Sequence, residues 1–146
     1  MTDLLSLKPN TANGQAIYKQ ACPVCHQVNK EGFDFGPNLT EIGSKYPKEG
    51  LLKSIVHPSE GISFNSEGYE LKMKDGSTLT GIIASKTAAE IILKFPGGSR
   101  QNIKTADVKS SRQLKVSMMP ERLYEAMSDQ ELADLLDYLA NLKKKQ

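Results

Sequence analysis

The chain has only two cysteines and two histidines among its 146 residues, and this scarcity excludes several kinds of site. An iron–sulfur cluster normally uses four thiolate ligands, and a structural zinc site needs a second ligand pair beside Cys22 and Cys25. The only histidine away from the cysteines is His57, which stands alone before Pro58. A single chain therefore has too few ligands to close either kind of site.

Long apolar runs and a strong net charge are also missing. No run approaches the roughly 20 apolar residues that cross a bilayer, so we expect no membrane span. The formal net charge of +2 is too weak to indicate a nucleic-acid partner. The first ten residues, MTDLLSLKPN, lack the basic-then-apolar pattern of a secretory signal. With 38% hydrophobic and 25% charged residues, the composition indicates one ordinary globular domain covering residues 1–146.

The segment QACPVCHQVN, residues 20–29, contains both cysteines and His26. A thioredoxin-like redox site would place its C-x-x-C pair at a turn from strand to helix, but the residues before Cys22 have a helical pattern. C-x-x-C-H is instead the attachment signature of c-type haem. In that arrangement Cys22 and Cys25 form thioethers, and His26 coordinates the iron as a neutral imidazole. We therefore predict one covalently attached haem c.

A short loop after the histidine offers a hydrogen-bond partner for its ring. A ligating histidine needs an acceptor for its other ring N–H, because that bond holds the tautomer and raises the basicity of the ligand. In DFGPNLTEIG, Pro37 has no N–H and a restricted backbone, so its carbonyl suits a fixed position. A Gly-Pro pair by itself indicates only a turn. After C-x-x-C-H, we predict that Pro37 supports His26.

The second axial ligand must come from far along the chain. KVSMMPERL places Met118 and Met119 directly before Pro120. Methionine more often fills cores, but two adjacent methionines outside a helical pattern suit that role poorly. The residue before a proline is driven to extended geometry, which lets a loop thioether reach across a haem face. We predict Met119 as the distal iron ligand, with Met118 as the neighbouring alternative and His57, expected at a helix end, as the competing ligand.

A helix is expected before the cysteines. In NGQAIYKQACPVCH, Gly14, Tyr18 and Cys22 recur at i, i+4 spacing and therefore share one helical face. Glycine inside a helix costs about 1 kcal/mol relative to alanine unless it permits a close backbone approach. Gly14 therefore either starts this helix or lets a second helix cross it closely.

The second helix is predicted from SDQELADLLDYLANL. Ser128 and Glu131 have the spacing of a capping box, which marks a helix start. The leucines that follow recur at helical spacing and form one apolar stripe. These leucines are Leu132, Leu135, Leu136, Leu139 and Leu142. We expect this helix to cross the first one, with Tyr138 near the contact.

Residues from about 67 to 116 have the pattern of strands. GYELKMKDGSTLTGIIA and EIILKF alternate apolar and polar positions, and Asp75-Gly76 is a two-residue hairpin signal. Pro96, Gly97 and Gly98 indicate a further turn, and RQNIKTADVKSSRQLKV contains two more short candidates. The apolar positions are Tyr69, Leu71, Met73, Ile91, Leu93 and Phe95. We expect four or five strands in a small antiparallel module with its own core.

The order of these segments resembles the Planctomycetes- and Verrucomicrobia-type cytochrome c haem-binding domain. The matching segments are CPVCH, GPNLTEIGSKY, LLKSIVHPS, GYELKMKDGSTLTGIIAS, SMMPERL and SDQELADLLDYL. The resemblance implies an α+β fold with a helical cytochrome c-like core, residues 10–60 and 117–143, around the covalent haem. The β module at about 67–116 would be an insertion. His26 would be the proximal ligand and Met119 the distal one, although PERL stands where the family tends toward PEGL.

These features predict a monohaem c-type cytochrome that carries single electrons and is not an enzyme. His/Met ligation leaves no open position on the iron. The expected partner is a redox protein, either a dehydrogenase or a terminal oxidase or reductase, and the resembling domains are often fused to sugar-dehydrogenase-like modules. Exported cytochromes attach haem in this way, which implies a periplasmic location with the signal removed. The alternatives are a haem sensor or peroxidase-like domain with a displaceable distal ligand, and a thiol oxidoreductase.

Overall fold

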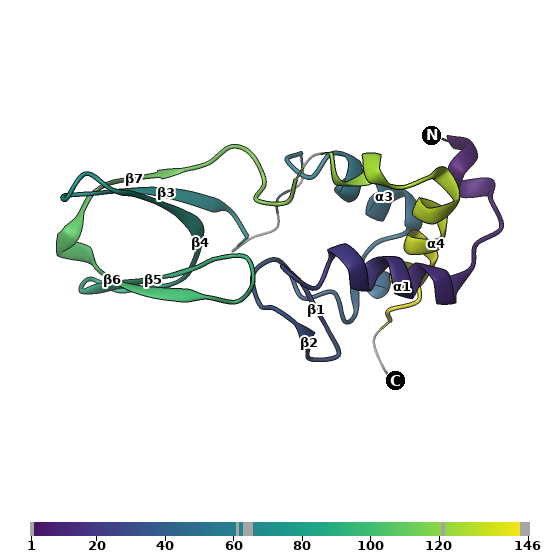
Figure 1. Cartoon of the computed structure of the whole chain (residues 1–146), viewed down its shortest axis with the longest axis horizontal. Coiled ribbons are helices and arrows are strands. Elements are labelled where there is room, and N and C mark those ends of the chain that lie inside the picture. Colours follow the sequence, from purple (N-terminus) through teal and green to yellow (C-terminus); the bar gives the residue numbers. More distant parts are fainter. Residues whose placement is uncertain (1, 61, 63–65, 121, 144–146) are drawn as a thin grey trace.

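The computed structural model describes residues 2–60, 62, 66–120 and 122–143. Helices lie at one end of an elongated molecule and a curled sheet at the other (Figure 1). The helical end contains η1 (Thr2–Ser6), α1 (Thr11–Ala21), β1 (Gln27–Val28), β2 (Glu31–Gly32), α2 (Ile42–Lys45), α3 (Lys48–Val56), η3 (Leu123–Ala126) and α4 (Asp129–Ala140). The sheet end contains β3 (Gly68–Met73), β4 (Thr78–Lys86), β5 (Glu90–Lys94), β6 (Arg100–Lys104), η2 (Thr105–Asp107) and β7 (Val108–Gln113). The predicted α+β class is confirmed.

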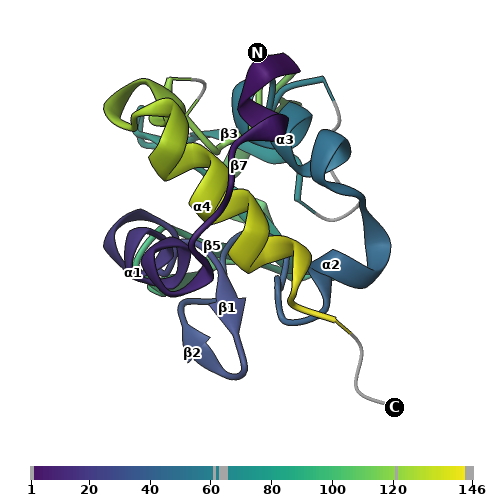
Figure 2. The same cartoon turned by 90° about the vertical axis from the view of Figure 1, so that its right-hand side faces the viewer.

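Helix α4 is the centre of the helical end. It lies between α1 on one side and α2 and α3 on the other (Figure 2), and it also contacts η1. Its start is the predicted capping box: Ser128 accepts from the Glu131 backbone N–H, and the Glu131 side chain accepts from the Ser128 backbone N–H. Leu132, Leu135, Leu136 and Leu139 are buried, as the stripe predicts, and Leu142 packs against the same cluster.

Helices α1 and α4 cross at Gly14. A Cβ atom on Gly14 would overlap the carbonyl oxygen of Asp134, so only glycine lets the two backbones come this close. The alternative that Gly14 starts the helix is wrong, because α1 begins at Thr11. The rings of Tyr18 and Tyr138 meet beside the crossing with centroids 5.5 Å apart, as expected for Tyr138.

A buried carboxylate joins the same two helices. Asp134 is 2% exposed and accepts hydrogen bonds from the Asn10 backbone N–H, the Asn13 side chain and the Gln130 side chain, each at 2.8 Å. Burial raises the pKa of Asp134, but these three donors outweigh it and hold the pKa below its ordinary value. The start of α1 is therefore bonded to α4 through a charged group whose hydrogen bonds are satisfied.

We predict that Gly14→Ala destabilises the protein by about 1–3 kcal/mol, because the added methyl group must displace the α4 backbone. Chemical denaturation with equilibrium fitting would measure the change. Gly50→Ala in α3 is the matched control, since a Cβ there meets nothing closer than 3.6 Å. The control is expected to gain up to about 1 kcal/mol from helix propensity. Equal effects in both variants would contradict the close crossing.

The sheet has five strands in the order β6-β5-β4-β3-β7, and every neighbouring pair is antiparallel. The predicted hairpin between β3 and β4 is present, but its loop has three residues rather than two. Met73 N–H donates to the Ser77 carbonyl at 2.8 Å, and Gly76, with φ of 93°, closes the turn. A second three-residue loop, Pro96–Gly98, joins β5 to β6, and the Phe95 N–H donates to the Ser99 carbonyl across it at 2.9 Å.

The sheet has a core of its own. Leu71, Ile91, Leu93 and Ile103 are 0–3% exposed and form a cluster separate from the helical one. Met73 and Phe95 pack against this cluster as the alternation predicts. Tyr69 lies outside it, and its hydroxyl donates to the Gln113 side chain at 3.2 Å. The module therefore buries its apolar faces mainly against one another.

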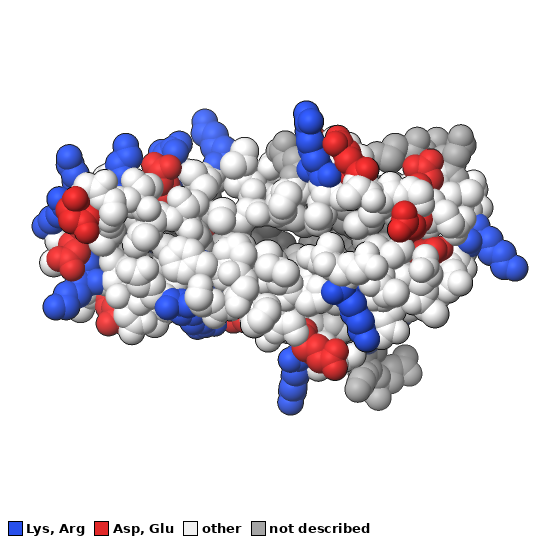
Figure 3. All heavy atoms as spheres, in the orientation of Figure 1, with Lys and Arg blue, Asp and Glu red and all other residues white. Residues whose placement is uncertain are grey.

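Basic side chains, with acidic ones among them, lie at the sheet end on the face shown in Figure 3. The two edge strands contribute exposed Arg100 and Lys104 from β6, and Lys109 and Arg112 from β7. Charged side chains on an edge strand discourage pairing with another chain, so these residues protect the open edges of the sheet. Among the described helices, none has both the length and the apolar character that crossing a membrane would require.

Candidate cofactor-attachment site

The C-x-x-C-H segment is a tight turn at the end of α1. Cys22 caps the helix, and its N–H donates to the Tyr18 carbonyl at 2.9 Å. The N–H groups of Cys25 and His26 then both donate to the Cys22 carbonyl, at 3.2 Å and 3.0 Å. One turn of chain therefore carries two half-buried free thiols and the imidazole, which is the local geometry that the spacing predicts.

The chain after the histidine folds back over this turn. Asn29 and Lys30 both have positive φ, as a two-residue hairpin loop requires, and they join β1 to β2. The returning segment donates from Phe33 N–H to the Pro23 carbonyl at 2.8 Å and from Phe35 N–H to the Cys25 carbonyl at 3.2 Å. This hairpin was not predicted from the sequence, because strands of two residues give almost no periodic signal.

The imidazole of His26 is held by the loop that contains Pro37. Nδ1 of His26 lies 2.6 Å from the Pro37 carbonyl oxygen, so Nδ1 carries the proton and Nε2 is left as the coordinating nitrogen. Gly36 makes this approach possible, since a Cβ there would lie 2.8 Å from the ring carbon Cε1. Burial lowers the pKa of His26, against the opposing effect of the Pro37 bond. The ring is therefore neutral at neutral pH, as a metal ligand must be.

The two thiols are poor nucleophiles in this environment. Burial, helped by the neighbouring Cys25, raises the pKa of Cys22 to about 11, and burial also raises the pKa of Cys25. A thiol oxidoreductase works through a cysteine whose pKa is lowered, so that the thiolate is present near pH 7. The environment of Cys22 and Cys25 is of the opposite kind and disfavours that alternative.

The two adjacent methionines lie against different parts of the molecule. Met119 packs against the helical cluster, and its N–H donates to the Ser117 hydroxyl at 3.1 Å. Ser117 N–H in turn donates to the Ser59 hydroxyl at 3.0 Å, which ties the methionine loop to the segment after α3. Met118 instead lies against β3, since a Cβ on Gly68 would be 2.9 Å from its sulfur. Glu121 of the same loop lies outside the described residues.

The competing ligand His57 lies at the surface. It caps the end of α3, is exposed, and its N–H donates to the Lys53 carbonyl at 2.7 Å. This agrees with its expected position at a helix end. Within the described residues there is also no cluster of three or more His, Cys, Asp or Glu side chains that could hold a bare metal ion.

The donor set fits a covalently attached haem. Two thiols and an imidazole with a free Nε2 come from one turn, and a half-buried thioether comes from a loop of the same helical cluster. The Tyr18 hydroxyl, one helical turn before Cys22, is buried and has no protein partner in the described part of the chain. A buried unpaired hydroxyl is costly, so this position calls for water or a bound group.

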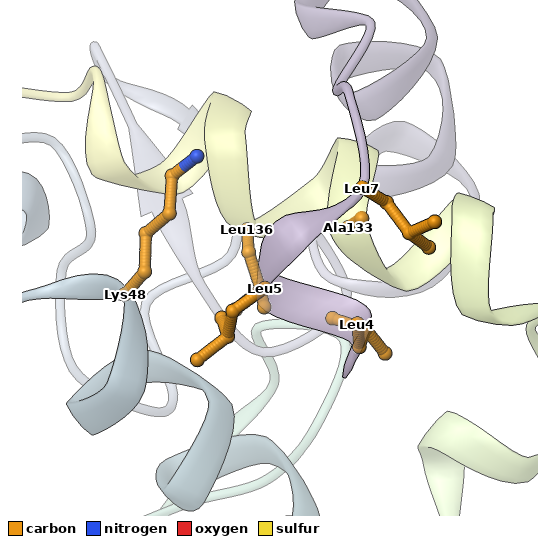
Figure 4. A pocket seen from close by; sticks show the side chains of 6 residues that line it. All are labelled: Leu4, Leu5, Leu7, Lys48, Ala133 and Leu136. Atoms are coloured by element: carbon orange, nitrogen blue, oxygen red, sulfur yellow. The ribbon is translucent and has the colours of Figure 1, made fainter. Parts of the chain in front are cut away.

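A small pocket lies between η1, α3 and α4, away from this site (Figure 4). Its lining residues are Leu4, Leu5, Leu7, Lys48, Ala133 and Leu136. Its volume of about 10 Å³ is close to that of a single water molecule, and none of its lining residues belongs to the C-x-x-C-H turn. We assign it no function.

Comparison with known proteins finds matches to cytochromes c. The model of the cytochrome c family matches residues 11–92. Cytochrome c-551 of Bacillus subtilis (strain 168) is 41% identical over 61 residues, which are 41% of this chain and 53% of that protein. The chain therefore spans about half the length of this curated relative. The family match includes C-x-x-C-H and Pro37, and it ends before the methionine loop.

Proposed function

This chain belongs to the cytochrome c family and binds haem c covalently, and from that premise we propose that it carries single electrons on one haem. Cys22 and Cys25 would form the two thioethers, with His26 and Met119 as the axial ligands. The observation that carries the proposal is the 2.6 Å contact between His26 Nδ1 and the Pro37 carbonyl, which leaves Nε2 free to coordinate. When bound, the haem supplies a one-electron iron couple.

The protein residues hold the site rigid around this couple. Pro37 fixes the orientation and tautomer of His26, and the turn that follows α1 fixes the spacing of the two cysteines. Ser59 and Ser117 hold the loop from which Met119 would reach the iron. With both axial positions taken by side chains, no position is left for a substrate, so an electron carrier is favoured over an enzyme.

We also propose the type of cytochrome domain, the class of redox partner and the location in the cell. The order of motifs supports the Planctomycetes- and Verrucomicrobia-type domain, and with it a role as the electron-accepting domain of a larger dehydrogenase system. The partner would be a redox protein, either a dehydrogenase or a terminal oxidase or reductase. The relationship to cytochrome c-551 and the covalent haem support a location outside the cytoplasm, and we propose the periplasm.

The attachment can be tested by denaturing extraction. In acidified acetone, the haem of the protein matured in cells is expected to stay with the polypeptide, because thioether bonds survive unfolding. Mass mapping should place it on the peptide that contains Cys22 and Cys25. Cys22→Ala with Cys25→Ala should release all haem into the organic phase. Release of haem from the unchanged protein, or its mapping to another peptide, would refute attachment at this turn.

A further inference from the structure

The sheet module reaches the attachment turn through one of its hairpin loops. Gly97, in the Pro96–Gly98 loop between β5 and β6, donates its N–H to the Val24 carbonyl at 2.9 Å. Val24 is one of the two residues between the cysteines. The returning segment 31–36 donates hydrogen bonds to the carbonyls of Pro23 and Cys25, on either side of Val24. The hydrogen bond to the Val24 carbonyl comes instead from the sheet module.

A single carboxylate fastens this loop in place. Asp34, in the segment between β2 and Pro37, accepts from Lys94 Nζ at 3.2 Å on one oxygen and from Arg100 at 2.7 Å on the other. Lys94 ends β5 and Arg100 begins β6, so the two cations flank the loop. The Lys94 side chain is 12% exposed, and the Asp34 side chain is 51% exposed. Asp34 therefore binds both β5 and β6, the two strands that the loop connects. We call this pair of salt bridges the clamp.

An aromatic contact completes the arrangement. Gly98 has φ of 88°, and a Cβ there would lie 2.5 Å from the ring of Phe33. Gly97 has a similar φ of 86°, but a Cβ there would meet nothing within 4 Å. The loop therefore contacts Val24 in the C-x-x-C turn and Phe33 in the segment that follows β2, and Asp34 of that segment binds the two strands beside the loop. Exposed ion pairs contribute little to overall stability, so stability alone is a weak reason for this clamp.

We propose that Asp34 is a positioning residue for the haem centre, which holds the β5–β6 loop over the C-x-x-C turn. The loop then covers the Val24 carbonyl and keeps water from the backbone of this turn, while the side chains of Val24 and Phe33 stay half exposed. Oxidised haem carries one more positive charge than reduced haem, so excluding water raises the reduction potential. This inference rests on the proposed attachment at Cys22 and Cys25.

A glycine substitution in the loop provides a test without any change of charge. Gly98→Ala should push the loop off Phe33, lower the reduction potential and speed amide exchange of Gly97. Gly76→Ala, in the loop between β3 and β4, is the matched control, because Gly76 has a similar φ of 93° and a Cβ there would meet nothing within 4 Å. Its potential should stay closer to that of the unchanged protein. If Gly98→Ala speeds the exchange of Gly97 but leaves the potential unchanged, the loop does not shield the centre and the proposal fails.

The clamp itself is tested by hydrogen exchange on the haem-loaded protein. Asp34→Asn and Arg100→Gln should each speed exchange of the Gly97 amide by about two- to fivefold, as expected when an exposed ion pair is lost. Asp107→Asn removes the same charge at an exposed site elsewhere in the module and should leave that amide unchanged. The Leu93 amide reports whether the sheet stays folded. No change on Asp34→Asn would overturn the clamp.

Mapping of the haem distinguishes this inference from the proposed function. If the haem is not on the Cys22–Cys25 peptide, the attachment itself is wrong. If the haem is on that peptide, but the reduction potential and the exchange of the Gly97 amide do not change as stated, only the clamp is wrong.

Discussion

Met119→Ala is expected to abolish the weak visible band that iron(III)–thioether coordination gives, and to lower the reduction potential. A thioether ligand stabilises ferrous iron, so its loss favours the ferric state. The expectation rests on the packing of Met119 against the helical cluster and on its backbone bond to Ser117. Absorption spectroscopy of the oxidised protein and a redox titration would measure both changes. The covalently attached haem itself should remain.

Met118→Ala is the matched control for this substitution. Its sulfur lies beside Gly68 in the sheet, so removing it should leave the thioether band in place. The opposite outcome, with the band lost only in Met118→Ala, would shift the ligand by one residue. If the unchanged protein shows no thioether band, His57→Ala tests the remaining candidate. An open iron position in the unchanged protein would favour the sensor or peroxidase-like alternative over a carrier.

Removal of the sheet is expected to leave a haem protein with His/Met ligation but lower stability and a lower reduction potential. The Leu114 N–H donates to the Gly68 carbonyl at 2.8 Å, so a short flexible linker can replace residues 69–113 without moving the ends apart. The sheet has its own apolar cluster, and the helical cluster is complete without it. Loss of the β5–β6 loop would expose the C-x-x-C turn to water.

Spectra, redox titration and thermal unfolding of this deletion variant would check the three parts of the prediction. Gly68 is kept, so the residue beside which the Met118 sulfur lies remains in the variant. Comparison with Gly98→Ala in the full chain separates shielding by the loop from the bulk of the sheet. Loss of the low-spin spectrum with haem still attached would show that the sheet positions Met119.

The sequence alone determined the chemistry of the site and the local structure around it. Cys22, Cys25 and His26 are adjacent in the chain, and so one turn suffices to bring them together. The capping box at Ser128 and the leucine stripe of α4 are equally local, because they depend on spacings of three and four residues. The alternation that predicted the strands works for the same reason. The prediction of Met119 came from the local Met-Met-Pro pattern, and the resemblance to a known domain implies the same residue.

Only the tertiary structure decided what the sheet module touches. Gly97 and Val24 are far apart in the chain, as are Asp34 and Arg100, and no periodic pattern relates such residues. The separate positions of Met118 and Met119 likewise depend on which folded surface each side chain meets. A local pattern records which face of an element is apolar, whereas contacts between loops depend on how the whole chain closes. The clamp on the attachment turn belongs to that second kind of information.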